Sequence, residues 1–242
     1  MMLKRNVRSG HEHHLAFSRE SGFTETLPFL RLGARGPQQE ILRQNIHALR
    51  RGPIRYRRNK VIVCEGDPAE YIFLVVSGVL RRCRTFRNGA RSIIAFHLPG
   101  ELFGWTFDTA HALSVEAATD ATVLFVKRSA LIASAGQNNA MANFLLANTA
   151  AELEHIQKHS VLIGRDAKFR ILSFLTDLAQ RTGGQNRVDL QMPHHDIADY
   201  LGLTIETVSR TITELERAGS LARQSRRTLL LKDPKSLAGM LN

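Results

Sequence analysis

Hydrophobic and polar residues alternate with two different periods along this chain, one typical of strands and the other of helices. From Val61 to Lys127, short runs of β-branched and aromatic residues are separated by turn residues, which is the pattern of strands. Asn88-Gly89 between two of these runs predicts a hairpin with a type I′ turn, in which both residues have positive φ. The predicted strands are VIVCEG, YIFLVVSG, VLRRCRTF, RSIIAFHL, HALSVEAA and ATVLFVK. Strands that are this short and evenly spaced indicate a small β-barrel or jelly roll.

Beyond the strands, the apolar residues follow the helical period. Ala140–Gly164 is expected to form one long helix, and Ala167–Arg181 a second amphipathic helix after a hinge at Arg165-Asp166. On the long helix, one set of residues recurs at alternating spacings of three and four, which is the pattern of a coiled-coil seam. These seam residues are Leu146, Thr149, Leu153, Ile156, Ser160 and Ile163. A second copy of the helix and the surface of the barrel are the two alternatives for what the seam faces.

The stretch His195–Gly219 has the pattern of two short helices joined by a tight turn, a helix-turn-helix. Gly202 is placed to open the turn, because glycine tolerates positive φ, and Thr204 is placed to cap the second helix. Apolar residues recur at core spacing in that second helix, namely Val208, Ile212 and Leu215. The opposite face carries the polar residues Glu206, Ser209, Arg210, Thr213 and Arg217.

The chemistry of this polar face suits the major groove of DNA. Arginine can bond bidentately to guanine, glutamate can accept from cytosine N4, and serine is an adaptable partner. Glu206, Ser209 and Arg210 lie in the first turns, the part of a recognition helix that reaches base edges. The alternative is an ordinary amphipathic helix with a solvated charged face. Phosphate or groove contacts are expected from the neighbouring residues Thr204, Ile205, Thr207 and Thr213.

Short strand candidates flank the helix-turn-helix on both sides, at Val188–Leu190 and Leu229–Leu231. The polar turn Arg223–Arg227 precedes the second of them, as the wing of a winged helix would. Arg226 and Arg227 are expected to bind backbone phosphate, which positions a protein on DNA without reading bases. A basic hairpin tip that is merely solvated is the alternative.

Two segments of the chain resemble the CRP/FNR superfamily. Leu203–Arg210, LTIETVSR, is similar to the recognition helix of the FNR and FixK branch, in which Glu, Ser and Arg read TTGAT-type half-sites. The resemblance assigns these roles to Glu206, Ser209 and Arg210. Within the strands, the order Glu-Gly-Asp, Ser-Gly and Pro-Gly-Glu-Leu resembles the cyclic-nucleotide-binding β-roll of the same superfamily. The resemblance extends from about Phe29 to Leu237.

The resemblance implies an α+β fold and a bacterial transcription regulator that binds a palindromic operator as a parallel homodimer. Its expected partners are double-stranded DNA, a second copy of the chain and RNA polymerase, and its expected location is the cytoplasm. No nucleophile–base signature, phosphate-cradling glycine loop or HExxH motif suggests an enzyme, so we expect no catalytic residues, bound metal or cofactor. The expected units are a tail over 1–24, the β-roll over 25–136, the dimerisation helix over 137–164 and the winged helix-turn-helix over 165–242.

The N-terminal segments are the least regular part of the chain. The tail is polar, without lasting periodicity, and is expected to be disordered. Its histidines His11, His13 and His14 could ligate a metal, but the sequence gives no sign of a folded second shell. Pro37–Leu49 is expected to form a short helix, and Arg50–Lys60 a basic turn that leads into the first strand.

Composition is that of an ordinary globular protein, with 43% hydrophobic and 23% charged residues. The sequence shows no apolar run of about 18 residues for a membrane span and no secretory signal. The net charge of +11 favours an anionic partner, but residues 1–60 hold 13 Lys/Arg against 4 Asp/Glu, whereas 165–242 hold 12 against 9. The helix-turn-helix motif, rather than the charge, therefore locates DNA binding.

The sequence argues against a cyclic-nucleotide receptor. Members of the superfamily that bind cyclic AMP hold its phosphate with an Arg-Ser pair about ten residues after Gly-Glu-Leu. Here no Lys or Arg lies between Arg91 and Lys127, and the corresponding stretch Trp105–Val115 is WTFDTAHALSV. A buried phosphate without a cationic partner is very costly. Gly100 and Glu101 are then best explained as turn residues of the fold.

Other effectors remain as alternatives. An iron–sulfur cluster needs about four thiolates, and the chain has two cysteines, which suit a reducing compartment. Cys64 and Cys83 are expected to be packed in strands, with a redox switch through either as an alternative. Haem would need a ligand, for which His97 and His111 are the candidates. The second hypothesis is thus a regulator whose roll binds a small ligand or haem, and the third is a regulator controlled only by its abundance.

Overall fold

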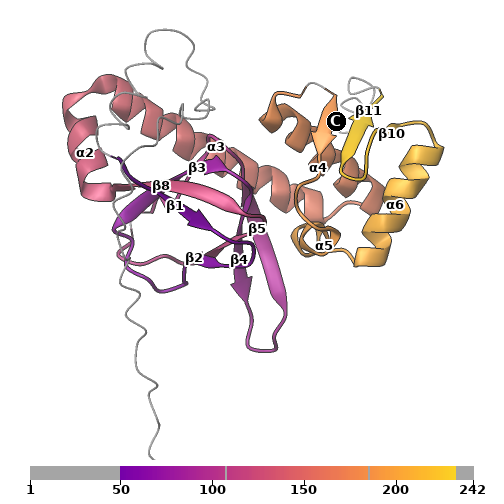
Figure 1. Ribbon diagram of the computed structural model, residues 1–242, viewed down its shortest axis with the longest axis horizontal. Helices are drawn as coiled ribbons and strands as arrows, with labels where there is room; N and C mark the ends of the chain where they lie inside the picture. Colours follow the sequence, from indigo (N-terminus) through magenta and orange to yellow (C-terminus); the bar gives the residue numbers. More distant parts are fainter. Residues whose placement is uncertain (1–49, 107, 185, 233–242) are drawn as a thin grey trace, which may run out of the picture.

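The roll and the helix-turn-helix domain lie side by side, and one long helix runs along both of them (Figure 1). The computed structural model describes residues 50–106, 108–184 and 186–232. The tail over 1–24 and the predicted helix Pro37–Leu49 lie outside the described residues, as do the histidines His11, His13 and His14. Within the described residues the elements follow the expected order of roll, long helix and winged helix-turn-helix, which confirms the α+β fold.

The roll consists of two antiparallel four-stranded sheets, with strand orders β1-β8-β3-β6 and β2-β7-β4-β5. Its strands are β1 Arg50–Tyr56, β2 Val61–Val63, β3 Tyr71–Ser77, β4 Leu80–Thr85, β5 Arg91–His97, β6 Leu102–Phe103, β7 Ser114–Ala117 and β8 Ala121–Lys127. Successive side chains of a strand point to opposite faces. The inward-facing ones form one buried core that includes Val75, Leu80, Phe103, Ala117 and Val123.

The basic segment Arg50–Lys60, predicted as a turn, begins with a strand of its own. β1 pairs antiparallel with β8 at the edge of the first sheet. Ile54 and Tyr56 pack against the roll core, whereas Arg55 between them is exposed. The prediction was wrong because the arginines mask this alternation, and charged residues are common on edge strands, where they discourage pairing with another chain.

The hairpin between β4 and β5 differs from the type I′ turn predicted for Asn88-Gly89. Gly89 has a φ of +82°, but Asn88 is not among the residues with positive φ. Phe86 N donates to the Ala90 carbonyl at 2.8 Å, and Gly89 N donates to the Phe86 carbonyl at 2.9 Å. These bonds close a three-residue loop that ends in a left-handed glycine, another common hairpin type. The Asn88 side chain contributes by accepting a hydrogen bond from Ala90 N at 3.0 Å.

The helices follow the roll in the order α2 Arg128–Gln137, α3 Asn139–Ile163, α4 Ala167–Thr182, α5 His194–Leu201 and α6 Ile205–Arg217. α3 begins where the sequence predicts, because the Asn138 side chain accepts hydrogen bonds from the N–H groups of Ala140 and Met141. Asp166 caps α4 in the same way through Phe169 N. None of the helices in the described ranges is long and apolar enough to cross a membrane.

Three short strands complete the helix-turn-helix domain, in the order β10-β11-β9. They are β9 Arg187–Asp189, β10 Leu221–Arg223 and β11 Thr228–Leu231. β9 and β11 match the two predicted strands to within a residue. β10 was not predicted, because a three-residue strand carries too little periodicity to be recognised. The antiparallel pair β10 and β11 forms the wing.

The helix-turn-helix domain packs against the roll as well as being connected to it through α3. One buried core contains Cys83, Ile93 and Phe96 of the roll together with Phe174 and Tyr200 of the helix-turn-helix domain. The Phe96 ring lies 5.3 Å from the Tyr200 ring and 6.1 Å from the Phe174 ring, measured between centroids. The outer face of the β4–β5 hairpin is thus buried by the other domain.

Candidate DNA-binding surface and ligand cavity

The turn between α5 and α6 has the local geometry that the sequence predicts. Gly202 adopts a left-handed conformation with φ of +61° directly after α5. Thr204 caps α6, since its hydroxyl accepts a hydrogen bond from Thr207 N at 3.1 Å, and Gly219 has a φ of +76° after the helix ends. The residues expected to face the core are all buried, namely Ile197, Leu201, Val208, Ile212 and Leu215. The helix-turn-helix is confirmed.

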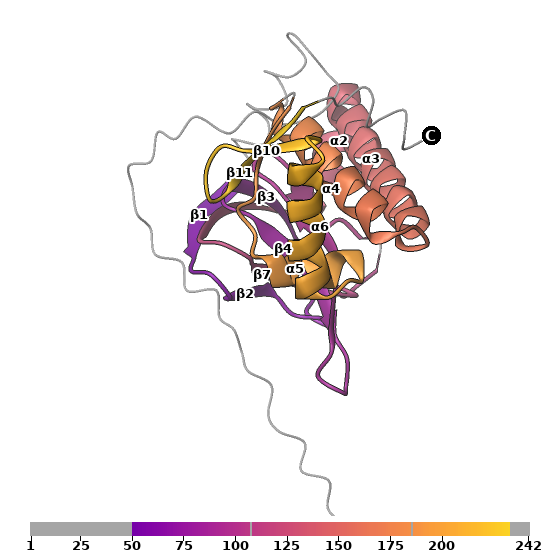
Figure 2. The same ribbon diagram turned by 90° about the vertical axis from the view of Figure 1, so that its right-hand side faces the viewer.

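The polar face of α6 points away from the domain core and from the roll. Figure 2, which looks at the helix-turn-helix domain end-on, shows α6 in front of the rest of the molecule. Glu206, Ser209 and Arg210 are exposed on this face. Arg210 has 70% of its side chain exposed, and its Nε lies 3.9 Å from Glu214 Oε1. A contact of that length on a wet surface constrains the guanidinium little, so these side chains are free to meet a ligand.

The residues beside Glu206, Ser209 and Arg210 differ in how free their side chains are. Ile205 is 47% exposed, but the threonine hydroxyls are already engaged within the helix. The Thr204 and Thr207 hydroxyls lie 3.1 Å apart, and the Thr213 hydroxyl donates to the Ser209 carbonyl at 3.0 Å. A phosphate oxygen only accepts hydrogen bonds, and a hydroxyl has one hydrogen to donate. Thr213 would therefore have to release the Ser209 carbonyl to donate to a phosphate. Of Thr204 and Thr207, the hydroxyl that accepts in their mutual contact keeps its hydrogen for another partner.

Glu206 is ionised at neutral pH in this arrangement. Hydrogen bonds from its own backbone N–H and from the Thr204 hydroxyl lower the pKa of its carboxyl group. An ionised carboxylate only accepts hydrogen bonds. It can therefore pair with an amino group such as cytosine N4.

The wing presents a basic tip. Arg226 and Arg227 are exposed between β10 and β11. The Ser225 hydroxyl shapes the turn by accepting from Thr228 N at 3.1 Å. Arg223 is occupied differently, since its Nε lies 2.7 Å from Glu216 Oε1 on α6. This ion pair ties the wing to α6.

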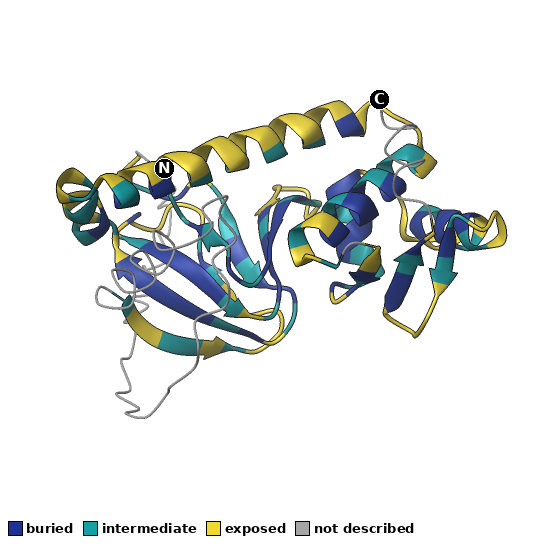
Figure 3. Ribbon diagram, turned by 90° about the horizontal axis from the view of Figure 1, so that it is seen from above, coloured by how far each residue is buried: buried dark blue, intermediate teal, exposed yellow. Residues whose placement is uncertain are grey.

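The predicted seam runs along the outer face of α3. Every seam residue is exposed, namely Leu146, Thr149, Leu153, Ile156, Ser160 and Ile163. Seen from above, most of the length of α3 is exposed (Figure 3). The seam hydroxyls are bonded within the helix, Thr149 to the Leu145 carbonyl at 2.9 Å and Ser160 to the Ile156 carbonyl at 3.0 Å. The seam therefore faces away from the roll, and burying it would leave neither hydroxyl without a partner.

Comparisons with known proteins agree with this architecture. The family model of the Crp-like helix-turn-helix domain matches residues 169–240, and the model of the cyclic nucleotide-binding domain matches residues 53–138. The nitrogen fixation regulation protein FixK of Azorhizobium caulinodans is 44% identical over 191 residues, which are 76% of this chain and 77% of that protein. The chain belongs to the CRP/FNR family, in its FixK-like branch.

Two further matches agree with membership of this family. The transcriptional activatory protein AadR of Rhodopseudomonas palustris is 32% identical over 68% of this chain and 71% of that protein. Among solved structures, FixK2 from Bradyrhizobium japonicum matches with a TM-score of 0.73 and 39% identity, covering 78% of this chain and 96% of that one. CRP/FNR proteins are transcription regulators that bind DNA, and this chain is one of them rather than an enzyme.

The Gly-Glu turn that this CRP/FNR chain shares with cyclic-nucleotide-binding rolls is engaged from within the molecule. Gly100 has a φ of +89°, and Glu101 Oε2 accepts a hydrogen bond from Leu98 N at 2.9 Å, so both are turn residues as predicted. Arg181 of α4 also binds both Glu101 carboxylate oxygens, at 3.0 and 2.7 Å. This contact could not be predicted from the sequence, because 80 positions separate the two residues. Glu101 therefore links the roll to the helix-turn-helix domain.

A cavity of about 690 Å³ lies between the roll, α3 and α4. Apolar residues line part of it, among them Ile72, Leu102, Trp105 and Leu145. The cationic residues that line it are each paired with a carboxylate: Arg82 with Glu152, Lys158 with Glu154, and Arg181 with Glu101 and Asp177. An incoming phosphate would have to displace one of these carboxylates.

Arg128, the first residue of α2, contacts the segment that begins at Trp105. Its Nη1 donates to the carbonyl groups of Thr106 and Asp108, at 2.8 and 2.7 Å. These bonds pin the loop that replaces the Arg-Ser region. The Arg128 guanidinium thus binds backbone carbonyl groups of this loop.

The cysteines occupy different environments. Cys83 lies in β4 and is buried, as predicted, but Cys64 follows the end of β2 and is only half-buried, because β2 pairs with β7 only as far as Val63. Burial, followed by the nearby negative charge of Glu116, raises the pKa of the Cys83 thiol to about 11. Burial and the neighbouring Asp67 also raise the pKa of Cys64. Both environments disfavour the reactive thiolate.

We expect both native thiols to react with iodoacetamide more slowly than free cysteine at about pH 8, with Cys83 slower than Cys64. Because the pKa of Cys83 is about 11, its labelling rate is expected to rise with pH throughout the mildly alkaline range. Peptide mass spectrometry after timed labelling measures both sites, and a denatured sample gives the unprotected rate. Fast labelling of either native thiol at neutral pH would favour the redox alternative.

The histidines weighed as haem ligands are part of the aromatic core of the roll. His97 in β5 is buried, and its ring centroid lies 5.2 Å from that of Phe103. Burial, reinforced by Arg82 and Arg181, holds the pKa of His97 well below its usual range, so the ring is neutral. His111 lies in the loop before β7, 6.4 Å from the Phe73 ring. Among the described residues, no cluster of three or more His, Cys, Asp or Glu side chains could hold a metal ion.

Proposed function

We propose that the protein is a homodimeric transcription activator that binds a TTGAT-type palindrome through Glu206, Ser209 and Arg210, without cyclic AMP or an iron–sulfur cluster. The observation that carries this proposal is the exposure of Glu206, Ser209 and Arg210 on one face of the capped helix α6, in a chain 44% identical to a FixK protein. The first turns of such a helix reach base edges in the major groove. Phosphate contacts from the wing arginines Arg226 and Arg227 would fix its register. Thr204, Ile205, Thr207 and Thr213 would add phosphate or groove contacts.

The exposed seam of α3 supports the homodimer. Leu153 is 56% exposed and Leu146 is 69% exposed, and apolar residues repeated in this way stabilise paired helices. Two copies related by a two-fold axis along α3 would present two recognition helices. Such a dimer suits half-sites whose centres lie about 34 Å apart, one turn of DNA.

The charge pairing in the cavity supports independence from cyclic AMP. Arg82, Lys158 and Arg181 already hold carboxylates there, and Trp105–Val115 carries no cation of its own. The amount of protein in the cell would then set its activity. A small apolar effector, haem, or oxidation of Cys64 or Cys83 is the alternative means of control.

Activation through RNA polymerase in the cytoplasm completes the proposal. It rests on membership of the CRP/FNR family and on relatives that are named as activators, such as AadR. In vitro transcription from a promoter with an upstream TTGAT-type palindrome, using purified polymerase, separates activation from repression.

The deciding experiment is fluorescence anisotropy of the purified, ligand-free protein on a TTGAT-type palindrome and on a scrambled duplex at one fixed salt concentration. A second arm adds cyclic AMP. Tight and selective binding in the first arm is expected. Selective binding only with cyclic AMP would overturn effector independence, and the absence of selectivity in both arms would overturn the proposed operator.

Replacing Arg226 with alanine is expected to weaken binding to specific and scrambled duplexes nearly equally. A lost phosphate contact removes counterion release rather than base reading, so the slope of log K against log salt should flatten by about one unit. Anisotropy titrations at several salt concentrations measure this slope. Arg84→Gln is the matched control, because Arg84 pairs with Glu65 within the roll, and a loss confined to the palindrome would contradict a phosphate role for Arg226.

A further inference from the structure

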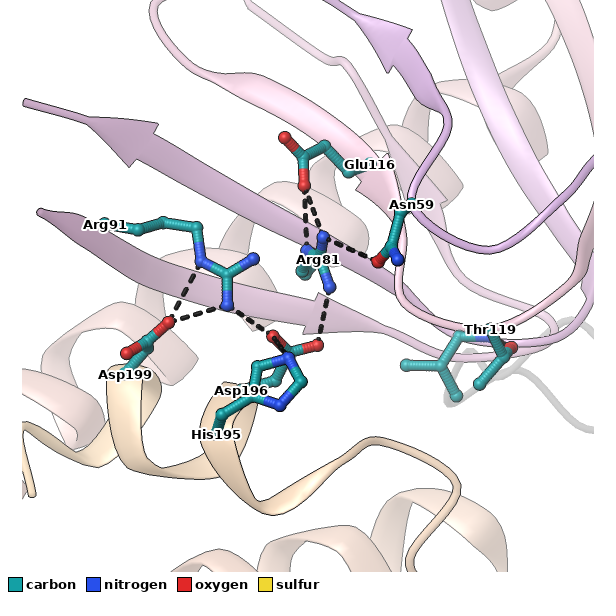
Figure 4. A network of polar contacts seen from close by, with 9 residues as sticks. Asn59, Arg81, Arg91, Glu116, Thr119, His195, Asp196 and Asp199 are labelled. Atoms are coloured by element: carbon teal, nitrogen blue, oxygen red, sulfur yellow. Dashed lines mark hydrogen bonds and ion pairs between the residues drawn. The ribbon is translucent and has the colours of Figure 1, made fainter. Parts of the chain in front are cut away.

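The first helix of the helix-turn-helix is locked to the roll by a network of ion pairs (Figure 4). Asp196 in α5 is fully buried, with 0% of its side chain exposed. Its Oδ2 accepts from Arg81 Nη1 at 2.8 Å and its Oδ1 accepts from Arg91 Nη2 at 2.5 Å. Both arginines belong to the roll, Arg81 to β4 and Arg91 to β5. One carboxylate thus receives two cations from the other domain.

Each arginine is held by further partners, Arg81 within the roll and Arg91 by α5. Arg81 is 4% exposed, and both its Nε and Nη2 donate to Glu116 Oε2, at 2.9 and 2.6 Å. Its Nη2 also contacts Asn59 Oδ1 at 3.2 Å. Arg91 is fixed from the other side, because its Nε and Nη2 donate to Asp199 Oδ2 at 2.9 and 2.7 Å. Charge-assisted bonds with several partners define orientation closely.

This network cannot act by touching DNA. Asp196 lies on α5 and faces the roll, whereas the reading residues Glu206, Ser209 and Arg210 are exposed on α6. Ile197 of α5 and Val208 of α6 are buried in the same core, so the two helices move as a unit. Holding α5 against the roll therefore holds the reading face of α6 as well.

We infer that Asp196, through Arg81 and Arg91, is a positioning residue that sets the angle of the recognition helix to the dimer axis and hence the half-site spacing that the protein accepts. The inference rests on the homodimeric, palindrome-binding function proposed above. α3 supplies the axis and is continuous with the roll, whereas the chain passes from α3 into the helix-turn-helix domain through the short linker around Arg165-Asp166. Beyond the linker, His159 of α3 contacts the Tyr200 carbonyl of α5 at 2.7 Å. The docked network converts this linker into a rigid joint.

Half-site spacing is a sensitive measure of such rigidity. Moving one half-site by a single base pair rotates it by about 34° around the DNA axis. A dimer whose recognition helices are fixed cannot follow this rotation, so its affinity falls. A dimer whose helix-turn-helix domains turn freely about the linker loses less affinity on the altered site, but it binds the native spacing less well because it must be ordered on binding.

The test compares Arg91→Gln and Asp199→Asn with the wild type on palindromes of native spacing and of spacing changed by one base pair in each direction. Arg91 and Asp199 are partly exposed, at 22% and 33%, so both variants are expected to fold. We expect the native-spacing affinity to fall by about ten-fold, within the usual range of coupling between sites, and the preference for native spacing to shrink. Arg84→Gln, on β4 but paired within the roll with Glu65, is expected to leave both unchanged.

A readout independent of DNA comes from Cys83, which is buried in the core that the two domains share. In a Cys64→Ser background, Arg91→Gln and Asp199→Asn should increase the alkylation rate of Cys83 several-fold, whereas Arg84→Gln should not. In the double variant Arg91→Gln/Asp199→Asn, the free-energy change that corresponds to the faster Cys83 alkylation should be smaller than the sum of the two single-variant changes. The reason is that the two residues act through one contact. Circular dichroism and sedimentation confirm that the fold and the dimer persist.

The outcomes separate this role from the proposed function. A variant that loses affinity equally at every spacing, or that keeps the wild-type preference while folded, would overturn the positioning role. A wild type that selects no palindrome at any spacing would instead overturn the proposed operator. A reduced preference for the native half-site spacing, together with faster Cys83 alkylation, would establish that Asp196 and its partners hold the helix-turn-helix domain at a fixed angle to the roll.

Discussion

Replacing Leu153 and Ile156 with aspartate is expected to convert the protein into a monomer and to abolish tight operator binding. Both residues lie in the middle of the exposed α3 seam, 56% and 37% exposed. In a parallel pair each would face its own copy, so the double change would bury like charges without partners. Losing the second half-site costs about 10²- to 10⁴-fold in affinity. Sedimentation equilibrium gives the mass, and anisotropy on the palindrome gives the affinity.

The double variant Glu154→Ala/Lys158→Ala is the matched control for this prediction. These residues form an exposed ion pair on the same helix but outside the seam, with Nζ and Oε1 2.7 Å apart. Such a surface pair contributes little to stability, so the control should remain dimeric and bind normally. An aspartate variant that is monomeric and still binds the palindrome with wild-type affinity would contradict the homodimer as the DNA-binding form.

The helix-turn-helix was predictable because its structural signals are local. Gly202 at the turn, Thr204 at the cap and Gly219 beyond the second helix each fix a backbone conformation within a few residues. The same is true of the roll strands, whose hydrophobic runs match the observed β3, β5 and β8 closely. Local backbone chemistry and burial point to the same answer in these segments, which is what makes a fold recognisable from its sequence.

The joint between the domains could not be predicted. Arg81 and Asp196 are 115 positions apart, and nothing in the periodicity of β4 or α5 distinguishes an arginine that crosses to another domain from a solvated one. The most direct signal was Asp196 itself, which falls on the apolar side of its helix beside Ile197. The segment Arg50–Tyr56 failed for a related reason, because its charges masked a strand that only pairing with β8 reveals.

Replacing Arg210 with alanine is expected to weaken binding to the palindrome by about 1–3 kcal/mol and to relax selectivity at one guanine of each half-site. A bidentate arginine–guanine contact supplies discrimination of this size. The guanidinium is available for it, being 70% exposed and only loosely held by Glu214. Anisotropy on a panel of duplexes, each with one base pair of the half-site changed, locates the position where the variant no longer discriminates.

Arg217→Ala controls for the loss of charge. Arg217 is an exposed residue of the last turn of the same helix, beyond the turns that reach base edges. Its removal should weaken every duplex slightly and leave the pattern of selectivity unchanged. If Arg210→Ala behaved in the same uniform way, Arg210 would be a phosphate contact and the base-reading role would fall to Glu206 and Ser209 alone. If Arg210→Ala instead bound equally well whichever base pair stood at one guanine position, and still discriminated at the other positions, that guanine would be the partner of Arg210. This result would fix the register of α6 in the major groove.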